Sequence, residues 1–385
     1  MSSTAYIFLL LITIGVCFIF TYLGRQPLPP GPKGKFFSSN IHQLPRIEPW
    51  QTFAGRSQQF LAWMYHELVG RKLAVFKISS QHPRFPVYRR MLHSNLSSRV
   101  VQDYDGPLDD ENAGAVILRV AYGWTVIEDD DYFVNLMEHV FRLGAEVTKP
   151  SRWLVDLFPI FRYLPTWLPG ATFHRHAAVY RTESTKSDTI PHTWAKEQIE
   201  ANHYHESFTS QHIKPADGHE ASSEEDDIIK WCSAALYAGG ADTTVAALLS
   251  FVLLTASCPE VQARAQTEID QDVGKDRLPT SRDEARLSYI SALFRRAIGR
   301  DPQLHADPDR FTHNRFIGEA AEPEHDPRKY VFGFVGRICP GLHFAERALF
   351  LNISRILALY NIQRAVDEEG REIDIEPVWV GGVTT

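Results

Sequence analysis

The chain begins with an apolar run, because residues 5–24 read AYIFLLLITIGVCFIFTYLG without a charged side chain. At the rise of an α-helix, such a run spans about 30 Å, the hydrocarbon thickness of a bilayer. Positive charges follow at Arg25, Lys33 and Lys35, which favours a cytoplasmic location for the rest of the chain. We therefore expect residues 1–25 to form a single-pass membrane anchor. The alternative is a cleaved signal peptide, whose apolar region usually spans about 7–15 residues.

A proline-rich stretch, PLPPGPKGK, follows the apolar run within residues 26–40. Closely spaced prolines fix φ and favour an extended polyproline conformation. We interpret residues 26–40 as a semi-rigid hinge that holds a domain at a set angle to the membrane; a generic linker has the same physics. Residues 41–385 are then expected to form the cytosolic domain.

The hydrophobic pattern of that domain is helical from about Asp103 onward. Residues 113–124 carry apolar side chains at helical spacing, and residues 129–147 open with an acidic turn that suits a helix N-terminus. Prolines divide residues 153–170 into short pieces, whose aromatic side chains are expected in the core, at the membrane or over a ligand cavity. Strand signals are few, so the pattern predicts a mainly α fold with minor β structure.

A long apolar helix is predicted after a polar stretch. Residues 205–227 end in ASSEEDD and are expected to form an exposed loop. Residues 228–256 are almost entirely apolar, which is typical of a helix that runs through the core. A second transmembrane span is the alternative, but the central Asp242, two glycines and the threonines argue against exposure to lipid.

Net charge and cysteine content exclude some classes of function. The net charge of -7 over 385 residues argues against nucleic acid as a partner, because phosphate binding needs a basic face. The four cysteines lie far apart, which is not the pattern of a disulfide framework and indicates a reducing compartment; they are Cys17, Cys232, Cys258 and Cys339.

The middle of the apolar helix carries the sequence GGADTT. Gly239 and Gly240 each cost about 1 kcal/mol relative to alanine in a helix, so we expect another group to approach the backbone there. Thr243 lies four residues after Gly239 and can donate a hydrogen bond to its carbonyl, which bends the helix. Asp242 is an expensive group to bury and is suited to relay a proton. A kinked core helix with a satisfied polar pair is the alternative.

The second candidate site is the stretch FGFVGRICPG, residues 332–341. A lone cysteine cannot build a zinc or iron–sulfur site, but Cys339 could supply the single proximal ligand of a haem. Arg337 is placed to pair with a haem propionate, and Phe332 to pack beneath the ring. Gly341 belongs to a corner before a predicted helix, whose N-terminal amides would stabilise the thiolate.

These two motifs, together with LPPGPKG, ILRVAYGW, PEVQARAQTEID and DPDRFTHNRF, resemble the cytochrome P-450 family and its fungal microsomal members. The resemblance implies a P-450-like helical fold, a haem with an axial thiolate from Cys339, and an acid–alcohol pair formed by Asp242 and Thr243 for proton delivery to dioxygen. Gly239 and Gly240 would then make room for that oxygen.

The resemblance also implies a reaction and its partners. We expect a monooxygenase that oxidises a lipophilic small molecule, in secondary metabolism, with O2 and with electrons from NADPH through a separate cytochrome reductase. The expected location is the endoplasmic reticulum membrane, with the catalytic domain in the cytosol and no nucleic acid bound.

The chain departs from the family pattern at several places. Val335 stands where the family has glycine, at a position where glycine permits φ > 0. Arg296 and Gly299 stand where the family's E-x-x-R helix has Glu and Arg. Segments are missing near residues 60–90 and 298–301, and Arg89 or Arg90 remains from a shortened arginine motif. The alternative hypothesis is therefore a catalytically compromised, non-catalytic membrane-anchored member of the family.

Overall fold

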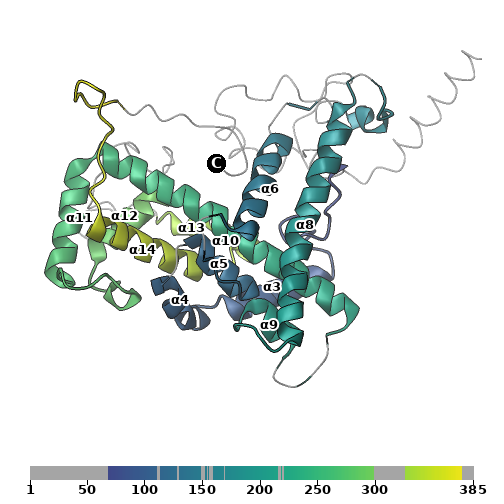
Figure 1. The fold of residues 1–385 in the computed structure, drawn as a ribbon, viewed down its shortest axis with the longest axis horizontal. Helices are drawn as coiled ribbons and strands as arrows, with labels where there is room; N and C mark the ends of the chain where they lie inside the picture. Colours follow the sequence, from purple (N-terminus) through teal and green to yellow (C-terminus); the bar gives the residue numbers. More distant parts are fainter. Residues whose placement is uncertain are drawn as a thin grey trace, which may run out of the picture.

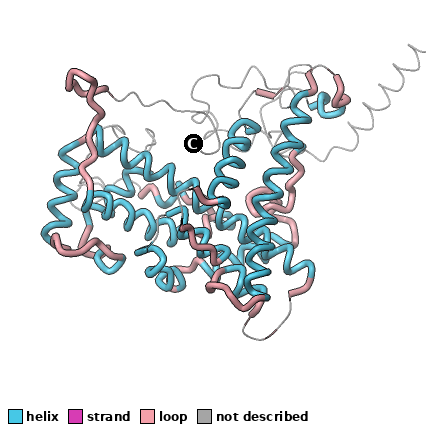
Figure 2. The backbone as a smooth tube through the Cα atoms, viewed as in Figure 1, coloured by secondary structure: helices cyan, strands magenta, loops and turns pink. Residues whose placement is uncertain are grey.

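A computed structural model describes residues 68–298 and 326–374, apart from short gaps at 111–112, 128–129, 149–151, 154, 156–158, 169, 216–217 and 219–220. Over these ranges the chain is helical (Figures 1 and 2). The predicted mainly α fold is confirmed, whereas β structure in the described ranges amounts to one isolated bridge between Val366 and Glu372. The predicted anchor, residues 1–25, and the hinge, residues 26–40, lie outside the described residues.

The described helices fall into a few long elements and several short ones. The long ones that organise the fold are α3 (Arg84–Asn95), α5 (Ala113–Tyr122), α6 (Tyr132–Thr148), α8 (Thr172–Glu200), α10 (Ser223–Ser257), α11 (Pro259–Asp272), α12 (Ser288–Ile298) and α14 (Leu342–Leu359). The short ones are α4 (Asp105–Asp110), α9 (Phe208–Ile213) and α13 (Arg328–Val331), with 3-10 turns that include η4 (Pro159–Tyr163) and η7 (Val335–Arg337).

Local capping sets where the predicted helices begin. The Asp131 carboxylate accepts hydrogen bonds from the backbone amides of Phe133 and Val134 at 2.8 and 3.1 Å, which starts α6 within the predicted acidic turn. Ser222 and Glu225 form a capping box, so α10 begins several residues before the predicted position. The start of each helix is therefore set by residues that lie close to it in the sequence.

Helix α10 is the central element of the fold. It packs against α5, α8, α9, α12 and α14, and Figure 1 shows it crossing the molecule between α6 and α8 on one side and α11, α12 and α14 on the other. Large side chains from many elements fill the core around it without solvent exposure; they include Tyr88, Ile117, Phe208, Phe251 and Phe350. This packing arranges the elements that carry the candidate site.

The prediction that α10 is buried on all sides is wrong for one face. Val245, Leu249 and Val252 are 43%, 56% and 37% exposed, because the neighbouring helices cover the other faces. Among the described helices, α10 has the length and apolarity to cross a membrane, and 22% of its most apolar window is buried. It nevertheless packs along its length against other helices of the chain.

The prediction of a continuous exposed loop over residues 205–227 is also wrong. The short helix α9 forms within it, and its Phe208 and Thr209 are fully buried. Ser207 and Ser210 make a capping box, and Thr209 Oγ1 donates to the Ala121 carbonyl at 2.7 Å. A single large apolar side chain and local capping thus outweigh the polar composition of the stretch.

The aromatic side chains of residues 153–170 divide between the core and the surface. Trp153 is buried in a second hydrophobic cluster with Phe173 and Tyr180 of α8, whereas Tyr163 and Trp167 are 60% and 79% exposed. In the described part of this stretch, the turn η4 begins at Pro159, and residues 164–168 form turns and irregular backbone, as predicted. Core packing therefore accounts for Trp153 but not for Trp167.

Candidate active site

The loop of residues 332–341 joins α13 to α14 and is closed by its own backbone. The Cys339 amide donates to the Phe332 carbonyl at 2.7 Å, and the 3-10 turn η7 lies between these two residues. Val335, which is 90% exposed, has φ +48°. The structure thus has a positive φ at the position where the sequence analysis predicted that glycine is needed, and a β-branched side chain is strained there.

Cys339 is a free and exposed cysteine beside the start of α14. A Cβ at Gly341 would lie 3.8 Å from the Cys339 sulfur and 3.8 Å from Leu96 Cδ1, so the thiol lies against the Gly341 backbone. Desolvation by neighbouring groups raises the pKa of the Cys339 thiol. The Gly341 amide and the charge of Arg89 act in the opposite direction and favour the thiolate.

Arg337, which was predicted as a propionate partner, and Arg89 of the shortened arginine motif both bind backbone carbonyls. Arg337 Nη2 donates to the Ile78 carbonyl at 2.6 Å, and its guanidinium lies 4.7 Å from the centre of the Phe85 ring. Arg89 Nη1 donates to the Ile338 carbonyl at 2.6 Å. Because a guanidinium has five N–H donors, these contacts leave others for a carboxylate. Together they attach the cysteine loop to α3 and to residues 71–80.

The two glycines of α10 allow the close approach that the sequence predicted. A Cβ at Gly240 would lie 2.6 Å from Cγ1 of Ile117, a fully packed side chain of α5. A Cβ at Gly239 would lie 3.1 Å from Cζ of Phe76, which is 64% exposed. The groups that approach the glycines in this structure are therefore side chains of α5 and of residues 71–80.

Asp242 and Thr243 differ in how their polar atoms are satisfied. Thr243 Oγ1 donates to the Gly239 carbonyl, which confirms the predicted bond within the helix. Asp242 is half-buried, and its Oδ2 is a buried atom without a hydrogen-bond partner among the described residues. A buried carboxyl oxygen without a partner is costly, so it is typically kept for a function or for a missing ligand.

Residues 76–78 contact both halves of the candidate site. The Phe76 ring lies against Gly239 of α10, and the Ile78 carbonyl accepts from Arg337 of the cysteine loop. Sequence reasoning did not single out Phe76 or Ile78, because neither belongs to a motif and each meets the site through long-range packing. The predicted residues Phe332 and Gly341 belong to the same loop as Cys339.

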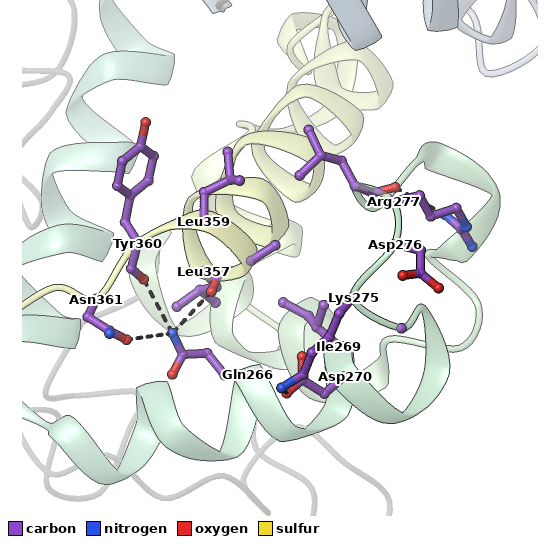
Figure 3. A pocket seen from close by; sticks show the side chains of 13 residues that line it. Gln266, Ile269, Asp270, Lys275, Asp276, Arg277, Leu357, Leu359, Tyr360 and Asn361 are labelled. Carbon is purple, nitrogen blue, oxygen red and sulfur yellow. Dashed lines mark hydrogen bonds and ion pairs between the residues drawn. The ribbon is translucent and has the colours of Figure 1, made fainter.

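A cavity of about 510 Å³ lies elsewhere, between α11, the end of α14 and the turn at Gly274 (Figure 3). The Gln266 amide donates to the carbonyls of Leu357 and Tyr360 at 3.1 and 3.3 Å and to Asn361 Oδ1 at 3.0 Å (Figure 3). These bonds attach α11 to the end of α14. The cavity lining contains none of the predicted site residues.

Comparison with known proteins identifies the family. A family model described as Cytochrome P450 matches residues 111–295 and 293–383. Cytochrome P450 monooxygenase claR of Ampulloclitocybe clavipes is 28% identical over 92% of this chain and 83% of its own length. Cytochrome P450 monooxygenase 208 of Postia placenta is 29% identical over 93% and 88%, and Cytochrome P450 monooxygenase ppsD of Aspergillus oryzae is 29% identical over 78% and 69%.

The alignment with claR runs over 452 positions, which exceeds the 385 residues of this chain, so the relative contains residues that the chain lacks. The two matched pieces of the family model meet at residues 293–295. Together they cover more than half of the chain. The chain belongs to the cytochrome P450 family, whose members are monooxygenases that use a haem iron with a thiolate ligand.

Proposed function

We propose that the chain is a haem-thiolate monooxygenase that oxidises a lipophilic small molecule in secondary metabolism, with O2 and with electrons from NADPH through a separate reductase. Family membership supports the reaction class. The observation that carries the proposal is the position of Cys339, a free thiol beside the Gly341 amide at the start of α14.

The residues present fit a haem that is held by one cysteine sulfur. Cys339 would supply that sulfur, and the Gly341 amide and Arg89 favour its deprotonated form. Arg337 keeps unused N–H donors for a propionate, and the half-buried Phe332 belongs to the same loop. When bound, the haem supplies the activation of O2, which electron donation from a thiolate favours.

In this proposal, Asp242 and Thr243 of α10 hold and move a proton. Asp242 Oδ2 has no hydrogen-bond partner among the described residues and is free to hold a proton. The Thr243 hydroxyl donates to the Gly239 carbonyl, which leaves its lone pairs able to accept a hydrogen bond from a neighbouring donor. Gly239 carries no side chain that would block this region of the helix.

We place the protein in the endoplasmic reticulum membrane with a cytosolic catalytic domain. The apolar run of residues 5–24 and the positive charges of Arg25, Lys33 and Lys35 support a single-pass anchor in this orientation. The prolines of residues 26–40 support a hinge between the anchor and the domain. A monooxygenase held at the membrane surface meets lipophilic substrates where they concentrate.

The carbon monoxide difference spectrum of the reduced protein tests the proposal. The purified chain is expected to bind haem and to give the spectrum of a thiolate-ligated iron, and Cys339→Ser is expected to abolish it. Cys258→Ser is the matched control, because Cys258 directly precedes α11 and does not belong to the 332–341 loop. A Cys339→Ser protein with an unchanged spectrum contradicts the assignment of the ligand.

The second candidate is a non-catalytic, membrane-anchored family member that does not hold haem. The observation that favours it is the strained φ of Val335 within the cysteine loop. Alignments longer than the chain also favour it, since they indicate absent residues. Haem content of the purified protein separates the two candidates, and NADPH-dependent O2 uptake with a reductase then tests turnover.

A further inference from the structure

A second cavity, of about 460 Å³, lies between the turn after α5, the start of α6 and the C-terminal half of α8. None of its lining residues belongs to the candidate active site, and most of them are aromatic or aliphatic. They are Trp124, Tyr132, Phe133, Thr189, Ile190, Thr193, Trp194 and Glu197. We call this cavity, with its four aromatic residues and Glu197, the aromatic cage.

The rings of the aromatic cage come from three elements and meet at steep angles. Trp124 and Trp194 have centroids 4.7 Å apart and planes at 78°, and Trp124 and Phe133 have centroids 4.5 Å apart and planes at 58°. Tyr132 and Phe133 lie 5.6 Å apart at 56°. Phe133 is buried, whereas Trp124 and Trp194 are partly exposed and Tyr132 is 57% exposed, so ring surface of these three residues borders the cavity. The negative faces of such rings attract a cation.

The charges around the aromatic cage favour a positive ligand. Glu197 lines the cavity and is exposed to solvent. The buried Asp131 accepts a hydrogen bond of 2.7 Å from Trp124 Nε1, which makes the indole more electron-rich. The Lys186 ammonium lies close enough to Tyr132 to interact with it, but it is paired with Glu183 at 2.8 Å. Lys186 does not line the cavity, and none of the lining residues is cationic.

We propose that the aromatic cage binds a small organic ammonium ion, such as a trimethylammonium group. Several ring faces and one carboxylate are the chemistry that recognises such a cation, because a methylated ammonium is weakly hydrated and has no need of several oxygen ligands. An anion would be repelled by Glu197, and no cationic residue lines the cavity to attract it. A purely apolar ligand would make no use of the Glu197 carboxylate. The site is independent of the haem-thiolate function.

Calorimetric titration of the full-length chain tests this inference with choline as the probe. Choline is compared with dimethylbutanol, its neutral isostere, which has the same shape without the charge. Choline is expected to bind at least about tenfold more tightly, in line with a desolvated cation–π interaction. Equal affinity for choline and its isostere, or no binding of either, overturns the proposal.

Variants locate the binding in the aromatic cage. Trp194→Leu and Tyr132→Leu are each expected to weaken choline binding by about fivefold or more, and Glu197→Gln by about threefold. Tyr132 is 57% exposed, so its replacement keeps the test valid if the Trp194 variant is unstable. Trp167→Leu and Glu200→Gln are matched controls, because both residues are exposed and neither lines the cavity. Choline binding that survives all three cage substitutions overturns the proposal.

The trimethylammonium group has two sources, a soluble metabolite and the headgroup of phosphatidylcholine. Co-sedimentation with phosphatidylcholine vesicles, compared with phosphatidylglycerol vesicles, distinguishes them. If Tyr132→Leu loses the preference for phosphatidylcholine vesicles, the aromatic cage binds the lipid headgroup. Binding of free choline without a vesicle preference supports the cage with a soluble ligand.

Discussion

Arg337 of the cysteine loop donates a hydrogen bond of 2.6 Å to the carbonyl of Ile78, which lies 259 residues earlier in the chain. The bond attaches the loop that carries Cys339 to residues 71–80, and the Phe85 ring covers the same guanidinium. A charged donor on a backbone carbonyl is worth about 1.5–3 kcal/mol when its loss leaves the carbonyl unsatisfied. The position of Cys339 therefore depends on a segment far from it in sequence.

Removal of this contact is expected to loosen the cysteine loop. Arg337→Ala should lower the free energy of unfolding by about 2 kcal/mol, because both the hydrogen bond and the cation–π contact are lost. Urea denaturation measures the change. Arg90→Ala, a substitution at an exposed position of α3, serves as the control and should change stability by less than about 0.5 kcal/mol. Equal effects of the two substitutions contradict the role of Arg337.

Replacement of Val335 by glycine is expected to stabilise the protein. Val335 has φ +48°, a conformation in which a β-branched residue is strained and glycine is not. Relief of the strain should raise the free energy of unfolding by about 1 kcal/mol, and thermal unfolding measures it. Gly336→Ala is the matched control with little expected effect, because its Cβ meets no atom within 4 Å. A lower Tm in Val335→Gly disproves the strain argument.

The close contact of α10 with α5 predicts that alanine changes the stability differently at Gly239 and at Gly240. Gly240→Ala places a Cβ 2.6 Å from Ile117 Cγ1 and should destabilise by about 1–3 kcal/mol through overpacking. Gly239→Ala meets only the tip of the exposed Phe76 ring, so the gain of about 1 kcal/mol in helix propensity should offset the contact. If the clash is the cause, the double variant Gly240→Ala/Ile117→Ala should lose less stability than the sum of the losses in the two single variants.

Thr243→Ala is expected to uncouple NADPH oxidation from product formation. The substitution removes the hydroxyl that lies beside Asp242, whereas the backbone helix stays intact. The ratio of product formed to NADPH consumed should fall, because a side chain that takes part in proton delivery is lost. Thr244→Ala is the comparison, because Thr244 is buried and makes the analogous bond to Gly240 at 2.7 Å. Equal coupling in wild type and Thr243→Ala removes the proposed role.

Asp283 is expected to control stability at acid pH. Hydrogen bonds from Arg277 hold the pKa of this carboxyl far below its usual range, with Thr280 and Arg286 also donating to it. Since the pKa is lowered in the folded state, the stabilisation is complete above the unfolded pKa of about 4 and is lost as the pH falls below it.

Asp283→Asn should lower the free energy of unfolding at pH 7 by about 2 kcal/mol and make it less dependent on pH below about 4. Denaturation curves measured between neutral and acid pH give both quantities. Asp276→Asn is the matched control in the same turn, because Asp276 is exposed. If the free energy of unfolding of Asp283→Asn depends on acid pH as it does in the wild type, Asp283 is not the source of this pH dependence.

Local chemistry explains the predictions that succeeded. The bond from Thr243 to Gly239 needs only a spacing of four residues in a helix, and the positive φ of Val335 occurs where the family pattern has glycine. The capping box of Ser222 and Glu225, which starts α10, is also formed by residues three positions apart. Each of these features depends on residues within about one helical turn of one another.

The amino-acid sequence by itself determined the helical pattern, the glycine pair of α10 and the single cysteine beside a helix start, since each of these depends on neighbouring residues. Tertiary structure decided which groups meet them. It placed Ile117 against Gly240, Phe76 against Gly239 and the Ile78 carbonyl on Arg337, because packing joins residues that no local rule relates. For the same reason the exposed face of α10 and the aromatic cage emerged only once the helices were assembled.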